Sequence, residues 1–553
     1  MDKKENSDKH NILIIMADDM GFADIGCYGS EIKTKNIDAL GYSGLRYTHL
    51  YNSARCCPSR ASLLTGLHPH QAGIGWMTNP AVIQIDQLGY QGFLNNSCMT
   101  IAEVLKLNGY RTFLSGKWHV GNTYDPLKIN SWTPGQPGFP IPTQRGFEQF
   151  FGTLDGAGSF YNPHTLMRNE TFIEPESPDF FYTDEIGNYA TKFIKESINE
   201  RYPFFGYIAF TAPHWPLHAP QEDISIFENY YKAGWDSIRT ARHEEQILKG
   251  IISSKWQISP RDEQSWPFEQ CKFPEWESLR MSVYAAQIHR MDIAIGKIIK
   301  TLKEYNIFDN TLIMILSDNG GCAEFLKEDT KDPTPHRYNQ PTLDGKSMKV
   351  GNNPQLNPGP SDTFMSYDIP WANVSNTPFR LYKSWVHEGG ISTPFIISWP
   401  QRIKEPGLRH CSIHIQDIMS TCIHSISASY PKEFNGHSLT ELAGESFLDS
   451  INNSNWSREK PIWFEHEGNR ALRDGPWKLV KRHPKKWELY NIYEDRTELN
   501  DMSEKENTRL SKMINHWENI SENVGVYDHK NLIDSISEKH LIDWETVRNK
   551  FKN

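Results

Sequence analysis

The stretch that decides the fold is Asn11-Ile12-Leu13-Ile14-Ile15-Met16-Ala17, seven residues without a charge. A continuous apolar run of this kind is typical of a strand that is buried on both faces of a parallel sheet. Similar runs occupy residues 204–210, 311–316 and 394–398, and residues 281–302 carry apolar side chains at helical spacing. Strands that alternate with helices predict an α/β fold, with a mostly parallel mixed sheet lying between helices.

The chain is long enough for two domains. Its 553 residues exceed what one compact core usually holds. The first predicted domain spans residues 10–450 and is interrupted by polar or loop-like insertions near residues 235–278 and 326–375. Short strand-like runs and one helical pattern then predict a smaller C-terminal α+β domain over residues 451–553, with an antiparallel sheet.

Composition excludes several classes of partner. Hydrophobic residues make up 38% and charged residues 23%, as in ordinary globular enzymes. The net charge of −10, with both signs interspersed, argues against nucleic acid or an anionic membrane as a partner. No apolar run is long enough for a membrane span or a secretory signal core, and the eight cysteines form no paired framework. We therefore expect a cytoplasmic protein.

Acidic residues follow two of the predicted strands. The first run leads directly into Asp18 and Asp19, and the run that ends at residue 316 leads to Asp318 and Asn319. Because ligands bind beyond the carboxyl ends of parallel strands, both pairs are expected to meet in one crevice. Three carboxylates and an amide oxygen suit Ca²⁺ or Mg²⁺ better than zinc. Each pair alone could instead cap a helix, and the presence of two matching strand ends favours the metal site.

A further stretch carries a reactive residue type: Cys56-Cys57-Pro58-Ser59-Arg60-Ala61-Ser62-Leu63-Leu64-Thr65-Gly66. Pro58 suits the first position of a helix and Gly66 its end, so residue 56 is expected just ahead of a helix N-terminus, which favours anions. The stretch resembles the signature of type I sulfatases, in which a dedicated enzyme oxidises the first cysteine to formylglycine. The resemblance makes Cys56 the nucleophile precursor rather than Cys57, because Pro58 and Arg60 follow it by two and four residues. The alternative is a turn that contains a buried structural cysteine.

Three more segments resemble the sulfatase family, namely Gly116-Lys117-Trp118-His119, Thr211-Ala212-Pro213-His214 and Lys383-Ser384-Trp385-Val386-His387-Glu388-Gly389-Gly390. The resemblance implies that Lys117 contacts sulfate and that His119 faces the second hydroxyl of the hydrated formylglycine. It makes His214 a substrate-binding residue and a candidate acid for the leaving group. Lys383 would bind sulfate and assist that protonation, and Arg60 would balance sulfate charge. Taken alone, the Lys117 segment favours an exposed strand edge with an ordinary lysine, since such charges are usually solvated.

The same resemblance covers the chain from about residue 10 to 500 and is nearest to bacterial arylsulfatases of the alkaline phosphatase superfamily. It implies an alkaline-phosphatase-like fold and a divalent cation, Ca²⁺ in preference to Mg²⁺. The ligands of that cation would be the residues of the two strand ends together with the modified residue 56: Asp18, Asp19, Asp318, Asn319 and Cys56. A formylglycine-generating enzyme is the implied partner during maturation.

The implied reaction is the hydrolysis of aryl sulfates, or of carbohydrate sulfates. A hydroxyl of hydrated formylglycine attacks sulfur, the alcohol leaves, and a covalent sulfated enzyme then expels sulfate as the aldehyde re-forms. Two alternatives stay open. A phosphodiester or phosphonate monoester hydrolase can use the same formylglycine and metal. A non-catalytic binder of sulfated glycans would leave Cys56 unmodified, although the presence of every expected site residue argues against it.

Overall fold

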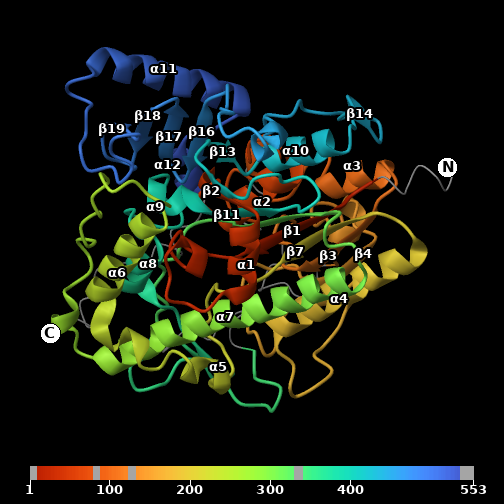
Figure 1. Ribbon diagram of the computed structural model, residues 1–553, viewed down its shortest axis with the longest axis horizontal. Helices are drawn as coiled ribbons and strands as arrows, with labels where there is room; N and C mark the ends of the chain where they lie inside the picture. The colour runs from red at the N-terminus through yellow and green to blue at the C-terminus, as the bar shows by residue number, and fades with distance from the viewer. Residues whose placement is uncertain (1–8, 79–86, 122–132, 329–339, 536–553) are drawn as a thin grey trace.

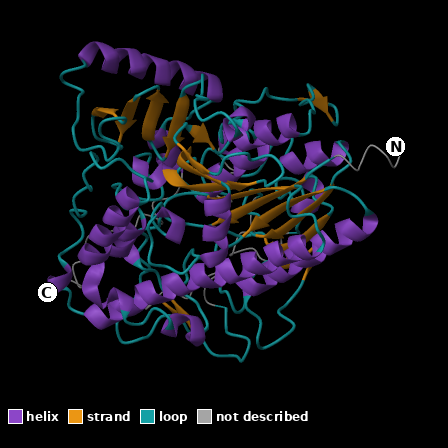
Figure 2. Ribbon diagram, viewed as in Figure 1, coloured by secondary structure: helices purple, strands orange, loops and turns teal. Residues whose placement is uncertain are grey.

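The computed structural model describes residues 9–78, 87–121, 133–328 and 340–535. A large mixed sheet lies between layers of helices, with a smaller sheet beside it (Figure 1, Figure 2). At the centre of the large sheet, β1 (Asn11–Ala17) pairs in parallel with β7 (Phe204–Ala209) on one side and β8 (Thr311–Ser317) on the other. Every residue of β1 is buried, as its apolar run predicts.

The strand order of the large sheet is β12-β2-β11-β8-β1-β7-β3-β4-β5-β6, with β13 beside β2. All pairs from β8 to β4 are parallel, whereas β11 runs antiparallel to both β8 and β2. The remaining strands are β2 (Leu45–Tyr51), β3 (Arg111–Gly116), β4 (Gln149–Thr153), β5 (Leu166–Arg168), β6 (Thr171–Phe172), β11 (Ser392–Ser398), β12 (Gly407–Arg409) and β13 (Ile413–His414). The predicted mostly parallel, mixed α/β sheet is confirmed.

The two faces of the sheet are covered by different helices. Alternate residues of β1 enter two separate cores, with Leu13 and Ile15 on one side and Ile12 and Ile14 on the other. The first core lies under α1 (Lys35–Ser43), α4 (Tyr182–Glu200) and α7 (Pro274–Glu304). The second lies under α2 (Cys56–Thr65), α3 (Ile101–Leu107) and α10 (Asp417–Ser425). The helix predicted over residues 281–302 is the central part of α7.

The two predicted insertions contain more regular structure than expected. The first holds α6 (Gly234–Leu248), and its tryptophans Trp235 and Trp266 are buried in the core instead of lying on a polar loop. In the second, residues 329–339 lie outside the described residues, and the described part forms β9 (Lys349–Val350), β10 (Thr363–Phe364) and α8 (Asp368–Ser375). Short elements elsewhere are α5 (Gln221–Ser225), α9 (Glu388–Ile391), β14 (Glu433–Phe434) and β15 (His437–Ser438).

The C-terminal part forms the expected antiparallel sheet. Its order is β16 (Ile462–His466), β17 (Asn469–Asp474), β18 (Trp477–Lys481) and β19 (Trp487–Asn491). The helix α11 (Asn507–Val524) covers one face, and α12 (His529–Ser535) follows it (Figure 1). The opposite face buries Ala471 and Val480 against Tyr51 of β2, so this sheet shares a core with the large one.

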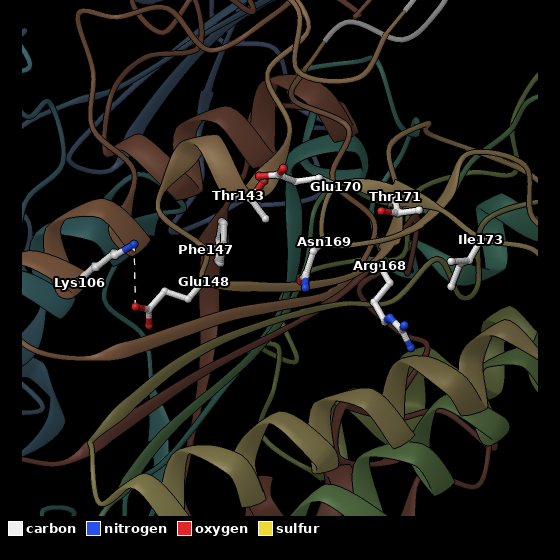
Figure 3. A pocket seen from close by; sticks show the side chains of 9 residues that line it. All are labelled: Lys106, Thr143, Phe147, Glu148, Arg168, Asn169, Glu170, Thr171 and Ile173. Atoms are coloured by element: carbon white, nitrogen blue, oxygen red, sulfur yellow. Dashed lines mark hydrogen bonds and ion pairs between the residues drawn. The ribbon is translucent and has the colours of Figure 1, made fainter.

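A hollow of about 700 Å³ lies at the edge of the large sheet, lined by Lys106, Arg168 and other mostly polar side chains (Figure 3). Its residue Glu148 directly precedes β4, so the hollow lies at the amino ends of the parallel strands. It is therefore separate from the carboxyl ends, where Asp18 and Asp318 lie. Within the described residues, no helix is both long and apolar enough to cross a membrane.

Candidate active site

The carboxyl ends of β1 and β8 bring the predicted acidic residues together. Ala17 pairs with Ser317 in the parallel register, so the residues that follow these two strands lie side by side. The Asp19 backbone N–H donates to Asp318 Oδ1 at 3.2 Å, and Asn319 Nδ2 donates to Asp19 Oδ1 at 2.6 Å. Asp18, Asp19, Asp318 and Asn319 are all 0–1% exposed. The predicted meeting of the two strand ends is confirmed.

This acidic cluster has the donor set of a hard-cation site. Asp18 Oδ1 and Asn319 Oδ1 are buried without a hydrogen bond among the described residues, and the nearest recorded cationic atom to Asp18 Oδ1 is Arg60 Nη2 at 3.7 Å. Such an arrangement costs free energy unless a cation or water satisfies the oxygens. Burial, followed by the nearby Asp318 carboxylate, raises the pKa of Asp18 well above its usual value. Oxygen atoms of Asp18 and Asp19 and a ring nitrogen of His214 lie within 4.8 Å of one another. These residues therefore fit a divalent cation, which would satisfy the unpartnered oxygens.

Three cationic side chains surround the acidic cluster, and each pairs with a different aspartate. The pairs are Lys117 Nζ with Asp18 Oδ2 at 2.6 Å, Arg60 Nη2 with Asp318 Oδ2 at 2.7 Å, and Lys383 Nζ with Asp19 Oδ2 at 2.9 Å. Burial acts to lower the pKa of Lys117 and of Lys383, but the aspartates outweigh it and raise both. All three cations therefore stay charged in a buried pocket.

Cys56 lies at the start of α2, beside this pocket. The helix begins at Cys56 itself and not at Pro58, two residues earlier than the sequence predicts, while Gly66 ends it with a left-handed φ of 69° as expected. Cys56 is 1% exposed. The pKa of the Cys56 thiol lies below its usual value, chiefly because Cys57 donates a hydrogen bond to it. Burial opposes this shift, and the charges of Lys117 and neighbouring groups reinforce it. The free N–H groups of this first helical turn favour negative charge.

His119 approaches the same helix from the end of β3. Its Nε2 lies 3.1 Å from Cys57 Sγ, and sulfur atoms of Cys56 and Cys57 lie within 4.8 Å of a ring nitrogen of His119. The residue has a left-handed φ of 53°, so the segment is not the regular extended strand that the sequence suggests. A Cβ at Gly156 would clash with the imidazole ring, so only glycine fits beside it. The proximity of Cys57 to His119 could not be inferred from sequence.

His214 and Lys383 meet on the other side of the acidic cluster. His214 Nδ1 lies 2.6 Å from the Trp215 carbonyl oxygen, and His214 Nε2 lies 3.2 Å from Lys383 Nζ. Since a carbonyl only accepts hydrogen bonds, Nδ1 carries the proton and Nε2 is free to accept one from Lys383. Burial lowers the pKa of His214 to about 4, which agrees with a neutral ring.

The loop that carries Lys383 is held by the C-terminal sheet. Glu388, five residues further on, accepts Lys478 Nζ at 2.9 Å and Arg496 Nε at 2.8 Å, and Lys478 also contacts Glu498 at 2.8 Å. All four side chains are 0% exposed. Sequence reasoning missed this ion cluster because Glu388 lies about a hundred residues from the other three members and no recognisable motif marks them.

The rim of the pocket also contains residues that the sequence did not indicate. Arg55, which precedes Cys56, contacts Glu324 at 3.0 Å and Glu467 at 3.3 Å. Glu324 accepts Trp215 Nε1 at 2.8 Å, and Glu467 accepts Trp76 Nε1 at 2.9 Å. These side chains are about one-fifth to one-quarter exposed, 18% for Arg55 and 27% for Glu467, so they can meet a substrate outside the buried pocket.

Comparison with known proteins agrees with this geometry. The Sulfatase family model matches residues 10–426, and the model described as N-sulphoglucosamine sulphohydrolase, C-terminal, matches residues 379–522. An uncharacterized sulfatase of Schizosaccharomyces pombe is 31% identical over 555 aligned positions, covering 93% of this chain and 94% of that protein. An arylsulfatase of Klebsiella aerogenes is 32% identical over 428 positions, covering 75% of this chain and 86% of that protein.

A solved structure shares the fold. Ps i-CgsB in complex with k-i-k-neocarrahexaose superposes with a TM-score of 0.65 at 24% identity, covering 96% of this chain and 98% of that one. At that identity the likeness establishes the alkaline-phosphatase-like architecture alone. The family match covers most of the chain and all the acidic, basic and cysteine residues of the pocket up to Lys383. This chain belongs to the sulfatase family.

Proposed function

We propose that this sulfatase hydrolyses aryl or carbohydrate sulfate esters, using a formylglycine made from Cys56 and a bound Ca²⁺ ion. The observation that carries the proposal is the convergence of Cys56 with four oxygen-donor residues and three cationic side chains in one buried pocket. A structural cysteine needs none of these neighbours. The hydrated formylglycine at position 56 would supply the hydroxyl that attacks sulfur.

Asp18, Asp19, Asp318 and Asn319 would hold the cation. Their donors are all hard oxygens, which suit Ca²⁺ or Mg²⁺, and the family resemblance favours Ca²⁺. The buried oxygens of Asp18 and Asn319 that lack a hydrogen bond support a bound ion at this position. When bound, the cation would neutralise charge on the sulfate oxygens as a Lewis acid.

Charge balance explains how the pocket selects an anion. With a cation bound, which would hold Asp18 ionised despite its raised pKa, Asp18, Asp19 and Asp318 contribute three negative charges. Arg60, Lys117 and Lys383 contribute three positive ones. The protein groups therefore sum to zero, and a divalent cation leaves the pocket positive. A sulfate monoester then interacts favourably both with the cation site and with the three basic side chains.

The two histidines serve different proton transfers in this proposal. Lys383 Nζ holds the proton that passes to the leaving oxygen, and His214 Nε2 orients Lys383 by accepting a hydrogen bond from it. His119 is buried, which lowers its pKa and keeps its ring neutral. Its Nε2 points toward the side chains at the start of α2 and can accept a proton from a hydroxyl at residue 56.

Two relatives support the choice of substrate. The arylsulfatase of Klebsiella aerogenes supports aryl sulfates as substrates, and the neocarrahexaose complex supports carbohydrates. We further propose that a formylglycine-generating enzyme acts on Cys56 during maturation, and that the protein works in the cytoplasm.

A substrate comparison tests the proposal. The chain is produced together with a formylglycine-generating enzyme, and kcat/KM is measured for p-nitrophenyl sulfate and for bis(p-nitrophenyl) phosphate. We expect the sulfate to react faster. Faster hydrolysis of the phosphodiester would support the phosphodiesterase alternative instead. An unmodified cysteine at position 56 together with no turnover of either ester would support a binding protein.

A further inference from the structure

The hairpin between β18 and β19 has the sequence Lys481-Arg482-His483-Pro484-Lys485-Lys486-Trp487. It belongs to the end of the small sheet that faces the candidate active site. Asn469 joins the two, because its Oδ1 accepts the His483 backbone N–H at 3.1 Å and its Nδ2 donates to the Ser384 carbonyl at 3.1 Å. Ser384 directly follows Lys383. The Arg482 guanidinium also lies 5.7 Å from the ring centre of Trp385, which completes the contact between hairpin and rim.

Cations are concentrated at this end of the sheet without ion pairs. Arg470 of β17 lies directly opposite Lys481 of β18, and Arg482, Lys485 and Lys486 follow in the hairpin. Across the described ranges, none of these five side chains forms a salt bridge. Two carboxylates of the same sheet are already engaged, since Glu467 pairs with Arg55 and Glu488 with Arg380. An unneutralised basic patch is unexpected in a chain with a net charge of −10.

The arrangement has an energetic disadvantage within the protein. Like charges directly opposite one another on antiparallel strands destabilise a sheet. Partial burial and the adjacent Arg470 lower the pKa of Lys481, which reports this repulsion. Cation–π contacts offset part of this repulsion. Arg470 lies 4.8 Å from the centre of the Trp517 ring, and Lys481 lies 5.6 Å from the centre of the Trp487 ring. Arg470 and Lys481 lie on the face of the sheet that α11 covers, whereas the next residue, Arg482, points to Trp385 at the rim of the pocket.

We propose that this basic hairpin, defined as Arg482, Lys485 and Lys486, binds a second anionic group of a polyanionic carbohydrate whose reacting sulfate ester lies at residue 56. The inference rests on the proposed function and extends it to the substrate class. Lys485 and Lys486 are exposed and follow Arg482 by three and four residues, and the Arg482 guanidinium lies over Trp385 at the rim, so positive charge extends from the exposed hairpin to the rim of the pocket. A sulfate or carboxylate on a neighbouring sugar would find both charge and a stacking surface there.

The test uses dextran sulfate as a probe and a triple variant, Arg482→Gln, Lys485→Gln and Lys486→Gln. Dextran sulfate is added to the hydrolysis of p-nitrophenyl sulfate by the mature enzyme at about 50 and about 500 mM NaCl, because screening differs several-fold between them. A matched control replaces three exposed lysines of α7, Lys297, Lys300 and Lys303, with glutamine. In Figure 1, α7 runs along the face of the molecule remote from β18 and β19.

We expect the inhibition constant of dextran sulfate to rise about tenfold in the hairpin variant at low salt, since each exposed ion pair contributes a few-fold. The kcat and KM for p-nitrophenyl sulfate should stay within about twofold, because this monoanion does not reach the hairpin. The control variant should behave as wild type, and the difference should shrink at high salt.

Two results would overturn the inference. One is an equal inhibition constant in the hairpin variant and the control. The other is equally strong inhibition by an oligothymidylate of the same charge, relieved by the same substitutions, which would mean that the hairpin does not select sulfated carbohydrate. If no form of the protein hydrolyses p-nitrophenyl sulfate, the proposed function fails. Calorimetric titration of dextran sulfate into wild type and variant then still decides whether the hairpin binds it.

Discussion

Replacing Lys478 with methionine removes the central cation of the cluster that joins the C-terminal sheet to the Lys383 loop. Methionine keeps most of the apolar stem of lysine and loses the ammonium group. In the native protein Lys478 Nζ contacts Glu388 at 2.9 Å and Glu498 at 2.8 Å, and all three side chains are fully buried. Burial acts to raise the pKa of Glu388, but Lys478 and Arg496 outweigh it and lower the pKa to about 2, so the carboxylate is charged.

The size of the effect follows from what remains. Removing one partner of a buried ion pair costs about 3–5 kcal/mol, because the other charge stays buried and unpaired. Glu388 would keep Arg496 at 2.8 Å, whereas the next cation from Glu498 is Arg380 at 3.8 Å. We therefore expect the free energy of unfolding to fall by about 3 kcal/mol, the lower end of that range. The change is measured as a shift of the midpoint of urea unfolding at constant slope. Since the cluster fixes the Lys383 loop, kcat for p-nitrophenyl sulfate should fall as well.

The control is Lys300→Met on α7. Lys300 is 77% exposed and pairs with Glu304 at 3.7 Å one helical turn away, so its replacement should change stability by less than about 0.5 kcal/mol. If Lys478→Met lowers the free energy of unfolding by no more than this control, the buried cluster does not stabilise the contact between the C-terminal sheet and the Lys383 loop, and the reasoning is wrong. An unchanged kcat in the Lys478 variant would show that the cluster does not position Lys383.

Three further predictions concern the pocket. Removing the proposed Ca²⁺ ion with a chelator should abolish hydrolysis and lower the midpoint of thermal unfolding. Added CaCl₂ should restore both in wild type but not in Asp318→Asn, and calcium-independent activity would argue against the cation site. His214→Ala should slow phenyl sulfate more than p-nitrophenyl sulfate, because the poorer leaving group needs protonation, and equal slowing would exclude this role. Gly156→Ala should displace the His119 ring and lower kcat. Elemental analysis should find the metal content unchanged. An unchanged kcat would show that His119 takes no part in the reaction.

The central architecture was predictable because it depends on local pattern. The apolar run of residues 11–17 has no polar face, so it fits only a strand covered on both sides, and α7 shows a clear helical spacing. The acidic residues at the strand ends were found for the same reason, since parallel strands place their carboxyl ends together. Conversely, β17 (Asn469–Asp474) gives only a weak strand signal in the sequence, because its two apolar residues, Ala471 and Leu472, are adjacent and lie between two arginines.

The supporting contacts of the site were not predictable from local pattern. Glu388 meets Lys478 and Arg496 only after the two sheets pack together, and no motif marks these residues. The same holds for Arg55, which contacts Glu324 from a distant loop. The helix start at Cys56 was misplaced by two residues because Pro58 is tolerated throughout the first helical turn, where no N–H bond is lost.

The most direct test of the account is the chemical state of residue 56 in active protein. Peptide mass spectrometry across residues 56–60, combined with hydrazide labelling, should find an aldehyde at position 56 and an intact thiol at Cys57. Cys56→Ala should abolish hydrolysis of p-nitrophenyl sulfate, and Cys57→Ala should retain most of it. An active protein with an unmodified cysteine at position 56, or an aldehyde at position 57, would contradict the account.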